Sequence, residues 1–127
     1  MEPIYSIETN RTFDETVKAI EEQTLAQGFR VLHIHDVQAT LADKNFEIEP
    51  LKIVEVCNAK YAYSALNINI TISLLMPCRI NVHTAEGKTV ISTFRPTALS
   101  NLFGDSDLST FAQDVEEVLL DIINNSK

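Results

Sequence analysis

The sequence contains no tryptophan, three glycines and two cysteines. With three glycines, the chain has no glycine-rich loop of the kind that binds phosphate. The GxSxG and HExxH patterns of hydrolases and zinc proteases are also absent. Two cysteines cannot build a disulfide framework, so we expect a reducing cytoplasmic location. No apolar run approaches the ~18 residues of a membrane-spanning helix, and MEPIYSIETN lacks the basic and apolar parts of a secretory signal.

The composition is that of a globular protein, with 45% hydrophobic and 22% charged residues among 127. We expect a single domain over residues 1–127, because no linker or repeat divides the chain. The net charge of −8 argues against nucleic acid or an anionic membrane as a partner, and it is typical of a soluble surface.

Alternating and β-branched patterns predict five strands, at residues 4–8, 29–37, 51–57, 78–84 and 89–95, with a turn at 85–88. In 29–37 the alternation places Val31, His33, His35 and Val37 on one face. Helices are predicted at 13–27, which Thr12 and Glu15 open with a capping box and Gly28 closes, and at 107–124. A third helix is predicted after Asn58, whereas residues 67–76 fit either helix or strand.

The predicted order βαββαββα indicates an α+β, plait-like sandwich, with one mixed or antiparallel sheet and helices packed on one face. The hairpin 78–95 and the strand 29–37 would then expose a sheet face that needs a cover. A second copy of the chain can supply that cover, so we expect a homodimer.

The stretch CNAKYAYSALNINITISLLMPCRINVHTAEGKTVISTFRP (57–96) resembles the bacterial and archaeal family called domain of unknown function 302. That family typically reads Gly-Asn-Pro-Lys, a helix, then Leu-Pro-Leu-Arg and a hairpin with a Gly-Lys turn. The positions in register are Asn58, Lys60, Leu66, Pro77, Arg79, Gly87, Lys88 and Pro96. The resemblance extends to the earlier FDETVKAIEEQTLAQGFRVLHIHDV, and it implies an α/β-plait fold and pairing through the sheet. It implies no activity. Cys57, Ala59 and Cys78 depart from the family pattern.

Cys57 immediately precedes the helix predicted after Asn58. The unpaired amides of a helix start stabilise a thiolate, and Lys60 one turn later would add to the effect, so a lowered pKa is one expectation for Cys57. The competing interpretation is a small side chain that fills a tight corner, and this is the one we favour. Cys78 lies on the apolar face of its predicted strand, which indicates a core position.

Whether the two cysteines meet depends on how their strands run. Parallel strands would place them at opposite sheet edges, about 15–20 Å apart, whereas a helical turn within 67–76 would allow them to approach. Tyr61 and Tyr63 fall on different faces of the predicted helix, so one can line a cleft while the other is exposed.

A metal or haem site is the weakest hypothesis. His33, His35 and His83, with Cys57 as a fourth ligand, are residue types that suit zinc, but two histidines at alternate strand positions also arise by chance. The other residues do not indicate any particular cofactor.

These patterns together predict a homodimer that binds a small ligand or partner without conventional catalysis. The candidate ligand-binding residues are Asn58, Lys60, Tyr61 and Arg79. A thiol-based redox or sulfur-transfer protein using Cys57, with Cys78 as its partner, is the alternative.

Overall fold

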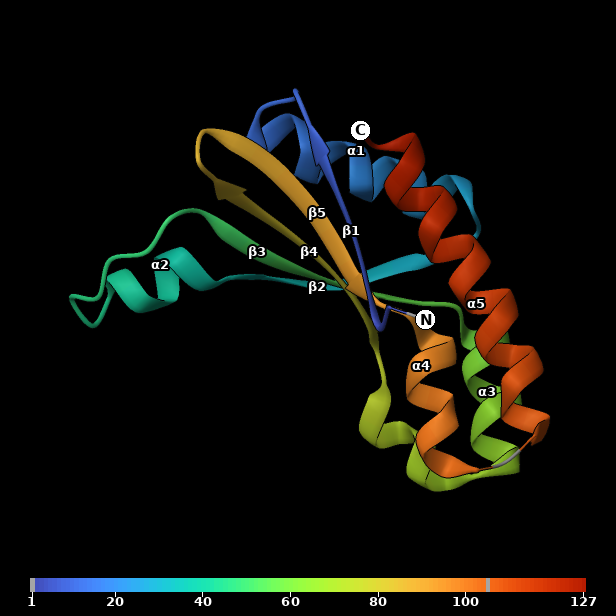
Figure 1. The fold of residues 1–127 in the computed structure, drawn as a ribbon. Coiled ribbons are helices and arrows are strands. Elements are labelled where there is room, and N and C mark those ends of the chain that lie inside the picture. The colour runs from blue at the N-terminus through green and yellow to red at the C-terminus, as the bar shows by residue number, and fades with distance from the viewer. Residues whose placement is uncertain (1, 105) are drawn as a thin grey trace.

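The computed structural model describes residues 2–104 and 106–127. The strands are β1 (Ile4–Thr9), β2 (Arg30–Asp36), β3 (Leu51–Cys57), β4 (Cys78–Ala85) and β5 (Lys88–Phe94). The α-helices are α1 (Phe13–Ala26), α2 (Val37–Ala42), α3 (Ala59–Ile68), α4 (Pro96–Ser100) and α5 (Ser106–Asn125), with 3₁₀ turns η1 (Ile70–Leu75) and η2 (Asn101–Phe103). The α+β sandwich predicted from the sequence is therefore confirmed, with α2, α4 and the two 3₁₀ turns as additions (Figure 1).

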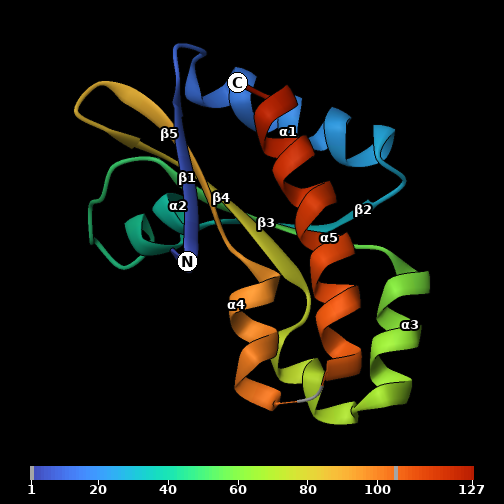
Figure 2. The same cartoon turned by 45° about the vertical axis from the view of Figure 1, so that its right-hand side comes forward.

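All five strands form one antiparallel sheet in the order β1-β5-β4-β3-β2. Helices α1 and α5 pack on the same face of this sheet, and α3 and α4 lie beyond one of its ends (Figures 1 and 2). The arm formed by α2 and residues 43–50 projects from the other end of β2 and β3 (Figure 1). The opposite sheet face is called the outer face here, and none of the described helices lies against it in Figures 1 and 2.

The start of α1 shows how the sequence fixes a helix boundary. The Thr12 hydroxyl accepts a hydrogen bond from the Glu15 amide at 3.2 Å, and the Glu15 carboxylate accepts one from the Thr12 amide at 3.0 Å. This is the predicted capping box, in which two otherwise free amides are satisfied reciprocally. Gly28 follows the helix with φ +80°, a backbone conformation that glycine adopts without strain.

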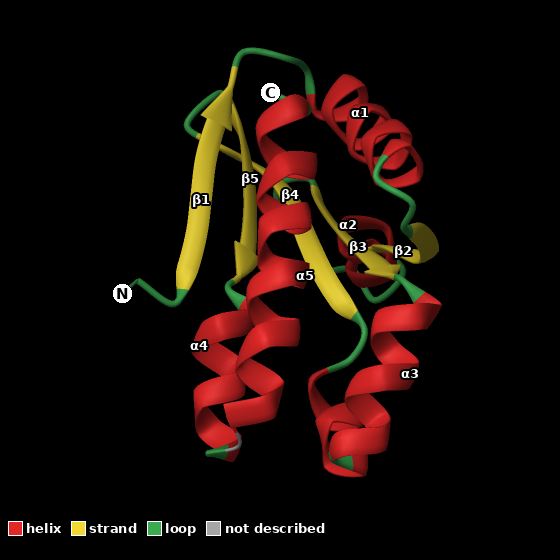
Figure 3. Cartoon of the chain, turned by 90° about the vertical axis from the view of Figure 1, so that its right-hand side faces the viewer, coloured by secondary structure: helices red, strands yellow, loops and turns green. Residues whose placement is uncertain are grey.

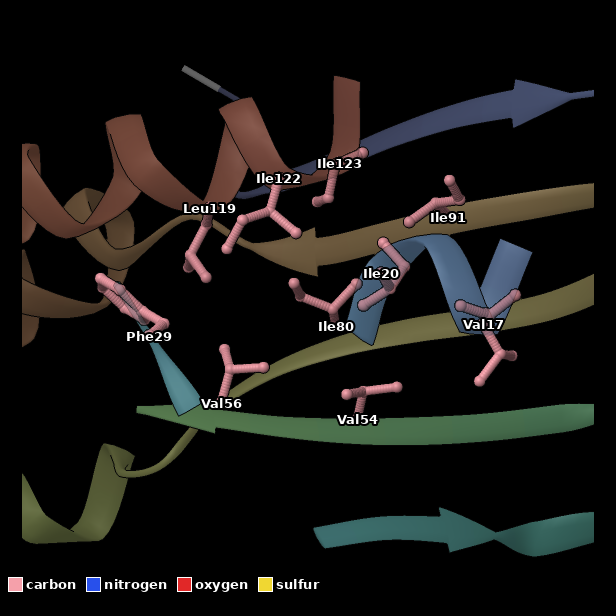
Figure 4. Close-up of a cluster of buried hydrophobic side chains, with 11 residues drawn as sticks. Val17, Ile20, Phe29, Val54, Val56, Ile80, Ile91, Leu119, Ile122 and Ile123 are labelled. Atoms are coloured by element: carbon pink, nitrogen blue, oxygen red, sulfur yellow. The ribbon is translucent and has the colours of Figure 1, made fainter. Parts of the chain in front are cut away.

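The core lies between the sheet and the α1–α5 layer (Figure 4). The strands contribute side chains from alternate positions, and α5 contributes residues spaced at three or four, as an amphipathic helix requires. The buried cluster comprises Val17, Ile20, Phe29, Val54, Val56, Ile80, Val82, Ile91, Leu119, Ile122 and Ile123.

A β-bulge in β2 corrects the predicted faces of that strand. Val31 pairs with Val56 and His33 pairs with Glu55, so Leu32 is an extra residue between them. Because the bulge shifts the alternation by one residue, Val31 points towards the core with Ile34, while His33 and His35 lie on the outer face. The prediction that Val31 shares a face with the two histidines was wrong.

Candidate functional site

The sheet splits at the end that faces α3 and α4. β4 begins at Cys78 and β5 ends at Phe94, but the pairing between the two strands stops at Asn81 and Ser92. Beyond that pair β4 turns towards α3 and β5 towards α4 (Figure 3). The Thr93 hydroxyl bridges the diverging strands by donating a 2.7 Å hydrogen bond to the Arg79 carbonyl.

A cavity of about 460 Å³ occupies this split end. Its walls come from the ends of β3, β4 and β5, from α3 and η1 on one side, and from α4 and the first half of α5 on the other. The lining is predominantly apolar, including Tyr61, Leu75, Leu99, Leu108 and Phe111. The volume falls within the range of roughly 300–1,000 Å³ that is usual for small-molecule sites.

Helix α4 is only five residues long, and Glu116 of α5 holds it in place. The Glu116 carboxylate accepts hydrogen bonds from the amide and hydroxyl of Thr97, at 3.2 and 2.7 Å, and contacts the Arg95 guanidinium at 3.5 Å. A carboxylate bonded to the first amides of a helix stabilises that end. The cavity wall formed by α4 is thus anchored to the long helix.

Two of the predicted ligand-binding residues, Asn58 and Tyr61, lie in the cavity wall, but their contacts differ. The Asn58 side chain caps α3 by accepting from the amides of Lys60 and Tyr61, at 3.0 and 3.1 Å, and its Nδ2 donates to the Gly28 carbonyl. Its polar groups are therefore engaged in holding the helix start. The Tyr61 ring packs 6.1 Å from that of Phe29, while Tyr63 is 71% exposed, so the predicted difference between the tyrosines is confirmed.

The other two candidates, Lys60 and Arg79, are placed differently. Lys60 is exposed on the first turn of α3 and lies outside the cavity lining. Arg79 lines the cavity, and its guanidinium Nε lies 3.9 Å from the Glu55 carboxylate. Glu55 in turn contacts His35 Nε2 at 3.1 Å, so a small charged cluster adjoins the cavity on the outer face.

Cys57 and Cys78 both line the cavity as free thiols. Cys78 is the register partner of Val56 across the antiparallel β3–β4 pair, so the cysteines lie at the same end of neighbouring strands. The alternative of parallel strands with cysteines at opposite edges is excluded. The alternative of a helical turn within 67–76 holds, since residues 70–75 form the helical turn η1 between the two strands.

The lowered pKa considered for Cys57 is contradicted by its surroundings. Burial raises the pKa of the Cys57 thiol, and the backbone hydrogen bond at Asn58 opposes this only in part. Burial, with a smaller contribution from the neighbouring Cys57, raises the pKa of Cys78 to about 11. The first amides of α3 are occupied by the Asn58 side chain, so the helix start offers the thiol little.

The histidines do not assemble into the predicted metal site. His33 and His35 are in contact, with ring centroids 4.4 Å apart, whereas His83 lies beside Leu51 and Val90 in the sheet register. Over residues 2–104 and 106–127, no three His, Cys, Asp or Glu side chains are grouped in a way that could hold a metal ion. The four-ligand set of His33, His35, His83 and Cys57 was therefore wrong.

Several cavity residues were not among the sequence candidates. Asn81 and Ser92 lie at the last pair before the split, and Phe94 lies just past it. Leu108 and Phe111 fall within the helix predicted at 107–124, and that prediction does not mark them as site residues. The alternation of β4 and β5 gives no signal for where their pairing stops, so nothing in the sequence singles these residues out.

A protein-family model, Domain of unknown function DUF302, matches residues 5–126. Among solved structures, the crystal structure of an uncharacterized conserved DUF302 protein from Bacillus stearothermophilus is similar, with a TM-score of 0.96 and 29% sequence identity over 100% of both chains. No curated protein matches the sequence. Among the described helices, none has the length and apolar character needed to cross a membrane.

Proposed function

The chain belongs to the DUF302 family, whose name assigns no activity, and we propose that it binds a small, largely apolar ligand in the cavity at the split end of its sheet. The observation that carries this proposal is the cavity itself. It is lined mainly by aliphatic and aromatic side chains, with few polar groups, which is the usual construction of a small-molecule site.

Binding of the neutral fluorophore N-phenylnaphthylamine tests the proposal, because its emission rises in an apolar site. We expect saturable binding with one fluorophore per chain. Ala65 of α3 lines the cavity, so Ala65→Phe should fill part of it and weaken binding by about tenfold or more. Ala59→Phe is the matched control, since Ala59 is exposed on the same helix. Equal binding by wild type and Ala65→Phe would contradict the proposal.

The outer face of the sheet supports a second element of the proposal, a homodimer. Ile4 and Phe94 are register partners at the split end and remain 51% and 54% exposed, and Phe46 on the projecting arm is 64% exposed. Ile4 and Phe94 are neighbouring exposed apolar side chains, and this favours coverage of that part of the face by a partner. A second copy of the chain would cover this face through a two-fold interface.

Sedimentation equilibrium at micromolar concentration tests the dimer. Val90 lies on the outer face between its register partners Glu8 and His83. Val90→Lys would place a charge in the interface while the neighbouring Glu8 accommodates it in the monomer. We expect Val90→Lys to sediment as a monomer and Thr110→Lys, an exposed change on α5, to sediment as a dimer. A monomeric wild-type protein would contradict this element.

Thiol chemistry is the second candidate function, favoured by the shared position of Cys57 and Cys78 in the cavity wall. Strand spacing puts their Cα atoms about 6 Å apart, within the range of a disulfide. The thiolate of Cys57 would attack a small disulfide and release one thiol, and Cys78 would then displace the second thiol. Because Val56 and Cys57 point to opposite sheet faces, closing the bond requires movement at the strand end.

Mass spectrometry after incubation with oxidised glutathione tests this candidate. An internal disulfide would lower the mass by two hydrogens, and Cys78→Ser would instead retain one glutathione on Cys57. An unmodified chain in both proteins would exclude thiol exchange without affecting the ligand-binding proposal.

A further inference from the structure

The cavity lining contains one charged side chain, that of Arg79, among the residues that the structure describes. The charge of the lining is opposite in sign to that of the whole chain, which carries 18 acidic and 10 basic residues and a net charge of −8. No aspartate or glutamate from 2–104 or 106–127 lines the cavity. The site therefore favours negative charge in a ligand, although the protein as a whole repels it.

The contacts of Arg79 leave its guanidinium available to a ligand. The Glu55 carboxylate lies 3.9 Å from its Nε, which is beyond hydrogen-bonding distance, and the Arg79 side chain is 56% exposed. Arg95 differs, because its Nη1 contacts Glu116 at 3.5 Å and its side chain is only 22% exposed. Glu55, itself held by His35 at 3.1 Å, orients Arg79 without saturating its donors.

The groups around Arg79 indicate which kind of anionic group the cavity would bind. Asn81 and Ser92, register partners at the last pair before the split, line the cavity and carry uncharged hydrogen-bonding groups. The first amides of α3 are bonded to Asn58, so they cannot serve as an additional anion site. One arginine with an apolar chamber behind it suits a monoanionic group, and the planar guanidinium matches a carboxylate.

We propose that the ligand is an amphipathic carboxylic acid, with its carboxylate on Arg79 at the cavity mouth and its apolar body between α3, α4 and α5. This rests on the proposed function and specifies the chemical class of its ligand. Asn81 and Ser92 complete the polar end of the site. An aliphatic or aromatic body fills the space bounded by Tyr61, Leu99 and Leu108.

Displacement of N-phenylnaphthylamine by decanoate and by decanol measures the preference for a carboxylate. In the wild type we expect decanoate to compete about tenfold better than decanol, or more, which is the effect of 1.4 kcal/mol. Arg79→Met should abolish that preference, which is measured as the ratio of the decanoate and decanol affinities within the same variant. Arg79→Lys should retain part of the preference.

Arg11→Met is the matched control, because it removes the same charge from an exposed position outside the cavity lining and should keep the preference. The wild type also provides a test without substitution. Salt should weaken decanoate binding and leave decanol binding unchanged, since a half-exposed ion pair is screened.

The outcomes separate the two proposals. The carboxylate assignment is overturned if the wild type binds the fluorophore and decanol but does not prefer decanoate to decanol. It is also overturned if Arg79→Met retains the preference for decanoate. In both cases the proposal of an apolar binding site stands. If the fluorophore, decanol and decanoate all fail to bind the wild type, both proposals fall together.

Discussion

The Thr93 hydroxyl donates to the Arg79 carbonyl across the point where β4 and β5 have stopped pairing. At 2.7 Å this hydrogen bond replaces the ladder that the diverging strands lose. It joins the strand that carries Arg79 to the strand that leads into α4, so it fixes the width of the split. The cavity depends on this link because it occupies the space between the two strand ends.

Thr93→Val removes this bridge while nearly preserving the shape of the side chain. We expect a loss of about 1 kcal/mol in the free energy of unfolding, because the part-buried Arg79 carbonyl loses this donor. Urea denaturation measures the change. Thr93→Ser keeps the hydroxyl and is the control for the bridge. Wild-type stability in Thr93→Val would contradict the role given to this bond.

Substitution of Thr84, near the other end of β4, should change the free energy of unfolding in the opposite direction. Its Oγ1 is buried and has no hydrogen-bond partner among the described residues. A buried hydroxyl without a partner loses its bonds to water and gains none in the fold. Thr84→Val should therefore raise the free energy of unfolding, by about 1 kcal/mol. Destabilisation in the same urea experiment would show that the hydroxyl has a partner in solution.

The capping box of α1 should make stability depend on acid pH. The backbone and side-chain hydrogen bonds at Thr12 lower the pKa of Glu15, so the folded state favours its ionised form. This contribution is complete above the ordinary carboxyl pKa and is lost as the pH falls through the lowered one. Glu15→Gln keeps a capping side chain without the charge, so we expect it to destabilise the protein at pH 7 and to have little effect at pH 3.

Glu22→Gln is the control for Glu15→Gln, because it removes the same charge from an exposed position later in α1. The two variants are compared by urea denaturation at both pH values. A Glu15→Gln effect of equal size at pH 3 would show that the loss is not electrostatic.

The cysteines should react slowly with iodoacetamide at neutral pH, since burial raises the pKa of both thiols. In the Cys57→Ser variant, which lacks the smaller contribution of the neighbouring thiol, burial should still hold the half-point of Cys78 alkylation above the ordinary thiol value. In Cys78→Ser, Cys57 should reach its half-point above the ordinary thiol value. Peptide mass spectrometry follows each site. A Cys57 half-point below about pH 7 would instead identify a reactive thiol.

The same raised pKa values predict a loss of stability in alkali. The folded protein holds both thiols protonated more strongly than the unfolded chain does. Their contribution is therefore complete below the ordinary thiol pKa and disappears as the pH rises towards about 11. The double variant Cys57→Ser, Cys78→Ser should lose less stability than the wild type between pH 8 and pH 10, measured by urea denaturation.

The candidate site was predictable only in part. Tyr61 and Arg79 were selected from the sequence and do line the cavity, while Lys60 does not. Asn58 lines it as well, but its hydrogen bonds show that it caps a helix. A family motif marks positions that matter without distinguishing those that hold the backbone from those that face an open space.

The sequence by itself determined the five strands, the three longer helices and their order, because each of these signals is local. Thr12 and Glu15, which are three residues apart, form the capping box that begins α1. The alternation of apolar and polar residues over 78–84 specifies a strand with two different faces. The tertiary structure alone decided which elements meet. Pairing with β3 placed the bulge at Leu32, and the antiparallel register brought Cys78 beside Val56. The cavity follows from where β4 and β5 part, and this depends on packing against α3, α4 and α5 rather than on any pattern within one strand.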